Sequence, residues 1–349
     1  MVRTGVFRVL SFVYGFATRR PGYHLRYVLA ELLRRESVVA PEYDYVFVTP
    51  PRSVAGWILS GICAEIAERV EGKYTFVHSD ERLPSATVYF FSHYAFFRDA
   101  LLRQPWIQAR RCLVFYTHPK ELAYSEDELI YVLGRCHRVI SMCQLFADRL
   151  IELGLSASRI EVATIGADPT QFQFHERGSG RVGFCSAYYP RKRPDRVMEI
   201  VKLMPDVEFR LLGRGWDKWE RFPELCEQKN FQYVECDYSE YPSFYREIDV
   251  LVSPAVCEGG PVPLMEAMMS NCVPVASRTG IALDIVRPGE NGFLFDVEAP
   301  TDEICELIRE ALYFKGDVRA TVSHLTWDRF AEQVRNIAKT GSGTGEICV

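Results

Sequence analysis

Short apolar runs alternate with segments of helical periodicity along this 349-residue chain, and the alternation restarts near its middle. This pattern predicts parallel strands whose crossover helices cover both faces of a sheet. In the first half the predicted strands are Phe7–Gly15, Tyr43–Thr49, Tyr74–His78, Thr87–Ser92, Cys112–Thr117, Arg138–Ser141 and Ile160–Ile165. Helices are expected at Gly22–Arg35 and Ser53–Val70, the second with Ser53 as its N-cap.

The second series of elements begins at Arg181. Its predicted strands are Arg181–Ser186, Glu208–Leu212, Gln232–Cys236, Asp249–Ser253, Val273–Ala276 and Gly292–Phe295. Its predicted helices are Pro194–Met204, Phe222–Lys229, Tyr241–Glu247, Val262–Ser270 and Thr301–Phe314. The length of the chain also suits two domains better than one core. We therefore expect an α/β protein made of two Rossmann-like, doubly wound parallel-sheet domains.

A turn-rich linker separates the two series. Gly166–Phe172 is followed by the polar stretch His175–Gly180, and such a density of turn residues marks a domain junction. We predict an N-terminal domain at residues 1–172, a C-terminal domain at 173–325 and a closing helix with a tail at 326–349. Ligands of doubly wound sheets bind at the carboxyl ends of the strands, so the site is expected in the cleft between the domains.

Two carboxylates bracket one strand-to-helix turn in the second half. The apolar run Val250–Pro254 leads into Glu258-Gly259-Gly260-Pro261, a helix follows, and Glu266 lies in its first turns. Amide groups at a helix start face an anion, whereas carboxylates repel phosphate and are suited to accept hydrogen bonds from neutral hydroxyls. A nucleotide sugar has this layout, with ribose hydroxyls, a diphosphate and sugar hydroxyls in a row.

This segment resembles the Glu-x7-Glu signature of the retaining glycosyltransferases of family 4, which have the GT-B fold. The resemblance implies that Glu258 contacts hydroxyls of the donor sugar and that Glu266 contacts the ribose. Pro261 stands where many members have Gly, which removes one N–H, so the phosphate donors are expected in the Gly259-Gly260 turn and at Val262. The structural alternative makes Glu266 a helix-dipole acid and Glu258 a solvated loop residue.

The resemblance covers roughly the last two thirds of the chain by pattern. Its further matches are Ile140-Ser141, Gly166–Phe172, Asn291–Phe295 and the pair Thr326-Trp327 before Phe330. In this family the closing helix returns to the first domain, and the N-terminal half selects the acceptor.

Lys192 is the expected catalytic cation, because it follows the strand Arg181–Ser186 and could neutralise a departing diphosphate. Family members have a Lys at this place and usually an Arg five residues earlier, where this chain has Ala187. Either Arg191 or Arg193 could substitute, and Arg191 is included among the predicted donor-binding residues. The structural alternative is a solvated basic turn.

His118 completes the predicted catalytic set, since it follows the strand Cys112–Thr117 and the family often has a His in this loop beside the sugar. His93 ends another strand and is its rival. The turn Gly213-Arg214-Gly215 resembles the Gly-x-Gly turn of the family near the nucleotide, so Gly213 and Gly215 are predicted to bind the donor.

Composition restricts the function classes. A formal net charge of -5 gives no support for nucleic-acid binding, and 11 cysteines without a Cys-x-x-Cys pair are typical of reduced thiols in a cytoplasmic protein. No Asp-x-Asp triplet and no zinc-binding spacing of His and Cys occur, so we expect no divalent metal and no other cofactor. Seven arginines against two glutamates in the first forty residues indicate either a solvated surface or contact with an anionic acceptor or the inner face of a membrane.

The sequence thus favours a retaining glycosyltransferase that moves a sugar from a UDP- or GDP-linked donor to a glycan or lipid-linked acceptor. Family resemblance implies front-face attack without a dedicated general base. A nucleotide-sugar-binding assembly partner without transfer activity is the alternative, motivated by Ala187 and Pro261. An epimerase of the same fold would need further acid and base carboxylates that the sequence does not place.

Overall fold

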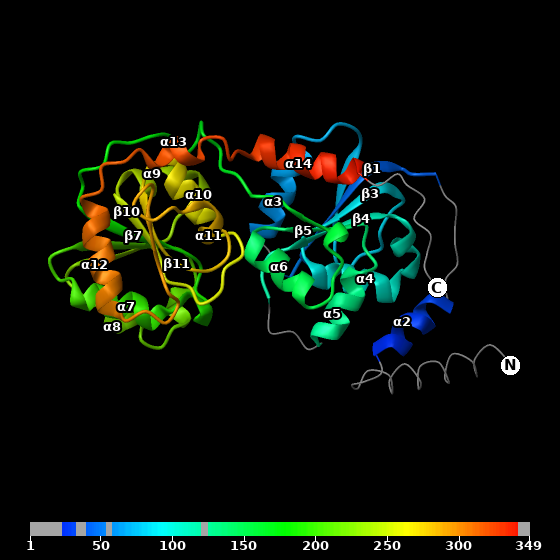
Figure 1. Cartoon of the computed structure of the whole chain (residues 1–349), viewed down its shortest axis with the longest axis horizontal. Coiled ribbons are helices and arrows are strands. Elements are labelled where there is room, and N and C mark those ends of the chain that lie inside the picture. The colour runs from blue at the N-terminus through cyan, green and yellow to red at the C-terminus, as the bar shows by residue number, and fades with distance from the viewer. Residues whose placement is uncertain (1–22, 33–39, 54–57, 120–124, 341–349) are drawn as a thin grey trace.

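A computed structural model describes residues 23–32, 40–53, 58–119 and 125–340. It contains two parallel six-stranded sheets, one in each half of the chain (Figure 1). The first sheet has the strand order β2-β1-β3-β4-β5-β6. Its strands are β1 (Tyr43–Thr49), β2 (Tyr74–His78), β3 (Ala86–Phe91), β4 (Arg111–Tyr116), β5 (Arg138–Ser141) and β6 (Ile160–Val162).

The second sheet has the order β12-β11-β10-β7-β8-β9, in which the direction of winding reverses between β7 and β10. Its strands are β7 (Arg181–Cys185), β8 (Glu208–Leu212), β9 (Phe231–Val234), β10 (Val250–Ser253), β11 (Val273–Ser277) and β12 (Phe293–Phe295). The predicted α/β class, with two doubly wound parallel sheets, is confirmed. The reversal between β7 and β10 is a topological switch point, where such sheets leave a crevice for ligands.

Helices cover both sheets (Figure 1). In the first half they are α2 (Tyr23–Leu32), α3 (Ile58–Ala67), α4 (Tyr94–Arg103), α5 (Glu126–Leu133) and α6 (Gln144–Glu152). In the second half they are α7 (Pro194–Leu203), α8 (Phe222–Cys226), α9 (Tyr241–Arg246), α10 (Val262–Met269), α11 (Ala282–Ile285), α12 (Thr301–Leu312), α13 (Val318–Val322) and α14 (Trp327–Lys339).

The central strands are apolar because both of their faces are buried. Val250, Leu251 and Val252 of β10 are each at most 2% exposed, and all five residues of β11 are buried. Continuous apolar runs of this kind are typical of parallel strands between two layers of helices. Polar residues therefore collect where the strands end, and the site lies there.

Two chain segments connect the halves and run side by side. Ala167 forms a parallel bridge with Thr326, and α14 then packs against α3 and β5 of the first half (Figure 1). Arg319 ties the first connection to the second half, since its guanidinium donates to the carbonyl oxygen of Pro169 at 2.9 Å and to those of Phe172 and Met269. The boundaries proposed at 172/173 and 325/326 remain predictions.

Most predicted elements lie within a few residues of the observed ones, and the differences are at their ends. The predicted strand Phe7–Gly15 lies outside the described residues. Ser53 lies in a turn and the described part of α3 begins at Ile58, so the N-cap prediction falls on a segment, 54–57, that is outside the description.

Candidate active site

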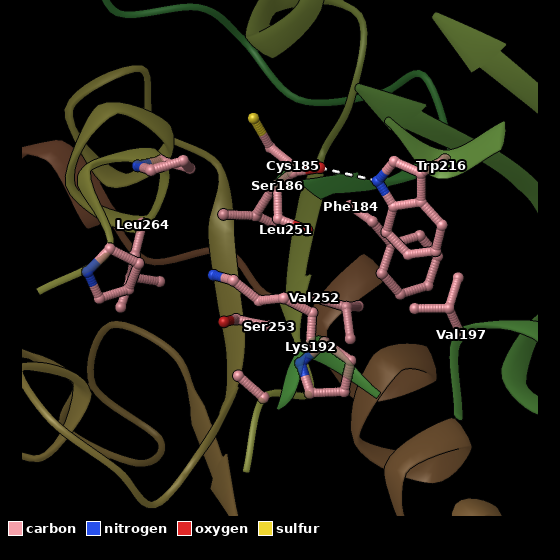
Figure 2. A pocket seen from close by; sticks show the side chains of 14 residues that line it. Phe184, Cys185, Ser186, Lys192, Val197, Trp216, Leu251, Val252, Ser253 and Leu264 are labelled. Carbon is pink, nitrogen blue, oxygen red and sulfur yellow. Dashed lines mark hydrogen bonds between the residues drawn. The ribbon is translucent and has the colours of Figure 1, made fainter. Parts of the chain in front are cut away.

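A small cavity lies at the switch point between β7 and β10 (Figure 2). The carboxyl ends of both strands line it, together with Lys192 from the 3-10 turn Pro190–Lys192 and the prolines at the start of α10. The indole Nε1 of Trp216 donates to the carbonyl oxygen of Ser186 at 2.8 Å and closes one side. The cavity therefore joins the predicted phosphate-facing helix start to the predicted catalytic cation.

The turn before α10 is held between the two halves of the molecule. A Cβ on Gly259 would lie 1.5 Å from the carbonyl oxygen of Thr117, which follows β4. A Cβ on Gly260 would lie 2.6 Å from the Met142 side chain, which follows β5. Both glycines are therefore required by close packing across the halves, a reason that is independent of any phosphate.

The helix itself begins as the sequence predicts. Pro261 is the N-cap of α10 and Val262 its first residue. No described residue accepts a hydrogen bond from the amide of Gly260 or Val262, while the Leu264 amide donates to the Pro261 carbonyl oxygen at 3.0 Å. The Gly260 and Val262 amides thus fit the predicted role of phosphate donors, which stays a prediction.

Glu258 is a buried ion-pair partner, only 6% exposed. Its carboxylate pairs with the ammonium group of Lys192 and with the guanidinium of Arg191, which also donates to the Cys257 carbonyl oxygen at 3.0 Å. Burial alone would raise the pKa of Glu258, but the charges of Lys192 and Arg191 outweigh it, so the pKa is lowered. A solvated loop acid has none of these properties.

The neighbouring arginines divide into two roles. Arg191 points at Glu258, whereas Arg193 pairs at 3.8 Å with the exposed Glu298. Arg193 adopts a left-handed conformation with φ 57°, where the 3-10 turn ends and α7 begins. Of the two substitutes for the missing arginine at Ala187, the structure places Arg191 beside the predicted catalytic residues.

His118 and His93 also differ. His118 is half-buried after β4, and its charge contributes to the lowered pKa of Glu258. His93 is 2% exposed and caps α4, since its Nδ1 accepts from the Ala95 amide at 3.1 Å. The structure therefore brings His118 toward Glu258 and gives His93 a structural task.

Glu266 is fully buried and held by two phenols. Its Oε1 accepts a hydrogen bond from the Tyr238 hydroxyl at 2.5 Å, and its Oε2 accepts one from the Tyr245 hydroxyl at 2.8 Å. Burial raises the pKa of Glu266 to about 7, and the two phenols offset part of that effect. The predicted ribose ligand is thus present at α10 with both of its oxygens already hydrogen-bonded.

The two tyrosines were missed by the sequence analysis. Tyr238, Tyr241 and Tyr245 are spaced three and four residues apart, a signal for one helix face that the predicted helix at 241–247 contained. In the structure Tyr238 belongs to the 3-10 turn Tyr238–Glu240 and Tyr245 to α9.

The Gly213–Gly215 turn lies beside β7. A Cβ on Gly213 would lie 1.9 Å from the Ser186 carbonyl oxygen, and Gly215 has φ 74° before the 3-10 turn Trp216–Lys218. Packing and backbone conformation therefore explain both glycines, and their contact with a donor remains a prediction.

The described residues contain no group of three His, Cys, Asp or Glu side chains arranged to hold a metal ion. Within the same part of the chain, no helix has the length and apolar character needed to cross a membrane.

Comparison with known proteins agrees with the fold and the site. The family model described as Glycosyl transferases group 1 matches residues 170–318, which include β7 to β12 and both glutamates, so this part of the chain is a domain of that kind. A Methanocaldococcus jannaschii protein named as an uncharacterized glycosyltransferase is 30% identical over 132 residues, which are 36% of this chain and 37% of that protein. Glycogen synthase of Pseudothermotoga lettingae is 27% identical over 177 residues, 45% of this chain and 36% of the synthase. The chain thus spans little over a third of the length of these relatives.

Solved structures show the same architecture. Anabaena HepE in complex with UDP and glucose has a TM-score of 0.68 at 14% identity, covering 86% of this chain and 100% of HepE. The lipopolysaccharide outer core galactosyltransferase WaaB has a TM-score of 0.61 at 14% identity, covering 84% and 98%. TarM of S. aureus, also solved with UDP, has a TM-score of 0.60 at 17% identity, covering 72% and 55%. The predicted GT-B fold is confirmed.

Proposed function

We propose that this protein is a retaining glycosyltransferase of family 4 that transfers a sugar from a nucleotide-sugar donor to an acceptor hydroxyl in glycan or glycolipid biosynthesis. The observation that carries the proposal is the pair of buried glutamates at the switch point, one neutralised by cations and the other held by phenols. Buried carboxylates with perturbed pKa values, next to a cavity and a helix start, are typical of functional sites.

In this proposal the donor lies across the start of α10. The diphosphate receives hydrogen bonds from the amides of Gly260 and Val262, and Lys192 and Arg191 supply its counter-charge. Glu266 accepts from the ribose and Glu258 from the sugar. The two cations, which pair with Glu258 in the structure, then serve the carboxylate and the diphosphate together.

The transfer step follows from these positions. The bond between the anomeric carbon and the leaving diphosphate oxygen breaks, and the acceptor oxygen bonds to the same face of that carbon. The acceptor proton passes to the leaving diphosphate, so no general base is assigned. Lys192 and Arg191 stabilise the charge on the diphosphate, Glu258 stabilises positive charge at the anomeric carbon, and His118 lies beside the sugar. Metal independence belongs to the same proposal.

The partners are proposed at a coarser level. Anabaena HepE and TarM were solved with UDP, which favours a uridine nucleotide as the first donor to test, with guanosine nucleotides next. The first half of the chain would select a glycan or lipid-linked acceptor. The basic N-terminal region, whose first 22 residues lie outside the described part, is proposed to contact an anionic membrane surface.

A binding partner without transfer activity is the second candidate, since Ala187 leaves the phosphate clamp without its usual arginine. Two measurements separate the candidates. A thermal-shift screen with UDP, GDP, ADP and TDP tests nucleotide binding, which both predict. NMR of the product then tests transfer: the retaining enzyme gives the anomeric configuration of the donor, inversion overturns the mechanism, and binding without turnover favours the second candidate.

A further inference from the structure

The two phenols on Glu266 differ in their surroundings. Tyr245 is fully buried, lies against Phe172 with ring centroids 5.7 Å apart, and its hydroxyl is 3.5 Å from Cys185 Sγ. Tyr238 is 44% exposed although its hydroxyl reaches the same carboxylate. Tyr245 therefore holds Glu266 from inside the domain, and Tyr238 covers it from the solvent side.

Glu266 cannot meet a ribose while this arrangement lasts. The residue is 0% exposed, so a ligand hydroxyl reaches it only after a neighbour moves. Tyr238 is the neighbour that can move at low cost, because it belongs to the three-residue turn Tyr238–Glu240 between β9 and α9. Moving Tyr245 would instead open the packed interior of α9.

The chemistry of the two hydroxyls is the same. A phenol and a ribose hydroxyl are both neutral donors to a carboxylate, and a buried carboxylate that loses its donor is strongly destabilised. In the structure Tyr238 supplies the bond that the ribose supplies in the proposed complex.

We propose that Tyr238 competes with the nucleotide ribose for Glu266 and thereby sets the affinity of the site for nucleotides. This inference rests on the proposed function and assigns opposite roles to two residues of the same type. Tyr238 must leave Glu266 when the nucleotide binds, and its ring stays near Tyr241, whose centroid is 5.1 Å away. Tyr245 stays and positions the carboxylate.

The test is calorimetry on the full-length protein with whichever of UDP, GDP, ADP and TDP binds most tightly. Tyr238→Phe removes the competing hydroxyl and should tighten nucleotide binding about tenfold, the worth of one hydrogen bond to a charged group. Tyr245→Phe, the matched variant at the other oxygen, should weaken binding about tenfold. Inorganic pyrophosphate has no ribose, so it should bind wild type and Tyr238→Phe equally.

Other results overturn the inference in recognisable ways. Unchanged or weaker nucleotide binding by Tyr238→Phe, with wild-type binding intact, sinks this inference and leaves the proposed function standing. A parallel gain for pyrophosphate also contradicts it, because the effect would not concern the ribose. Binding by Tyr238→Phe alone would support it, and no binding by either protein would overturn both proposals. Tyr238→Leu, melted beside each sample, covers a failure of the Phe variant to fold.

Discussion

The main-chain carbonyl of Thr117 packs directly on the α-carbon of Gly259, although the two residues belong to different halves of the molecule. This contact brings the loop after β4, which carries His118, against the turn that carries Glu258. The two halves of the site are therefore positioned by a contact that only glycine permits.

Gly259→Ala should separate these halves. The new methyl group would overlap the Thr117 carbonyl oxygen, so we expect a loss of about 1–3 kcal/mol in the free energy of unfolding together with reduced turnover. Gly61→Ala is the matched control: a Cβ at Gly61 in α3 meets nothing within 4 Å, and alanine should stabilise that helix by roughly 0.4–1 kcal/mol. Urea titration measures both, and equal stability of the two variants would contradict the contact.

The cations next to Glu258 should not be interchangeable. Lys192→Met and Arg191→Met should each weaken binding of inorganic pyrophosphate by about tenfold or more, because each removes a charge that the diphosphate needs. Arg193→Met is the control, since Arg193 pairs with the exposed Glu298 and both side chains must adopt the same left-handed backbone. A loss at Arg193 equal to that at Arg191 would show that the assignment of the clamp is wrong.

Glu266 should make the stability of the fold depend on pH. Its pKa in the folded protein is raised by burial to about 7, against 4.5 for the ordinary group, so the folded state favours the protonated acid. The stability from protonation is complete below the ordinary pKa and is lost as pH rises through the folded one. Glu266→Gln, which cannot ionise, should therefore gain about 3 kcal/mol on wild type between pH 4 and pH 8. Urea titrations at both pH values measure this gain, and a difference that stays constant with pH would contradict the buried-acid assignment.

Much of the architecture could be predicted because it follows from local pattern. The runs around β7 and β10 are apolar, short and separated by helical periods, and the segment Glu258–Glu266 contains its own strand end, glycine turn and helix start. The partners of the glutamates could not be predicted, since Tyr238 and Tyr245 approach Glu266 from 28 and 21 residues away. Sequence spacing likewise gave no sign that Thr117 would lie on Gly259, because that contact depends on how the halves pack.

Turnover should persist when divalent metal is removed. The chain has no Asp-x-Asp triplet, and the proposed charge stabilisation comes from Lys192 and Arg191. We expect the rate of donor turnover to be unchanged by EDTA. Loss of activity with EDTA that Mn²⁺ or Mg²⁺ restores would overturn this part of the proposal.

The most direct measurement is the release of nucleoside diphosphate from UDP-, GDP-, ADP- and TDP-linked sugars by the wild-type protein and by Glu258→Gln. The account predicts that the wild type turns over at least one donor. It also predicts that the isosteric amide lowers kcat on the order of 10²-fold, because it no longer stabilises positive charge at the anomeric carbon. A wild-type protein that releases nothing from any donor, or a folded variant that keeps more than about half of the wild-type rate, would contradict the central claim.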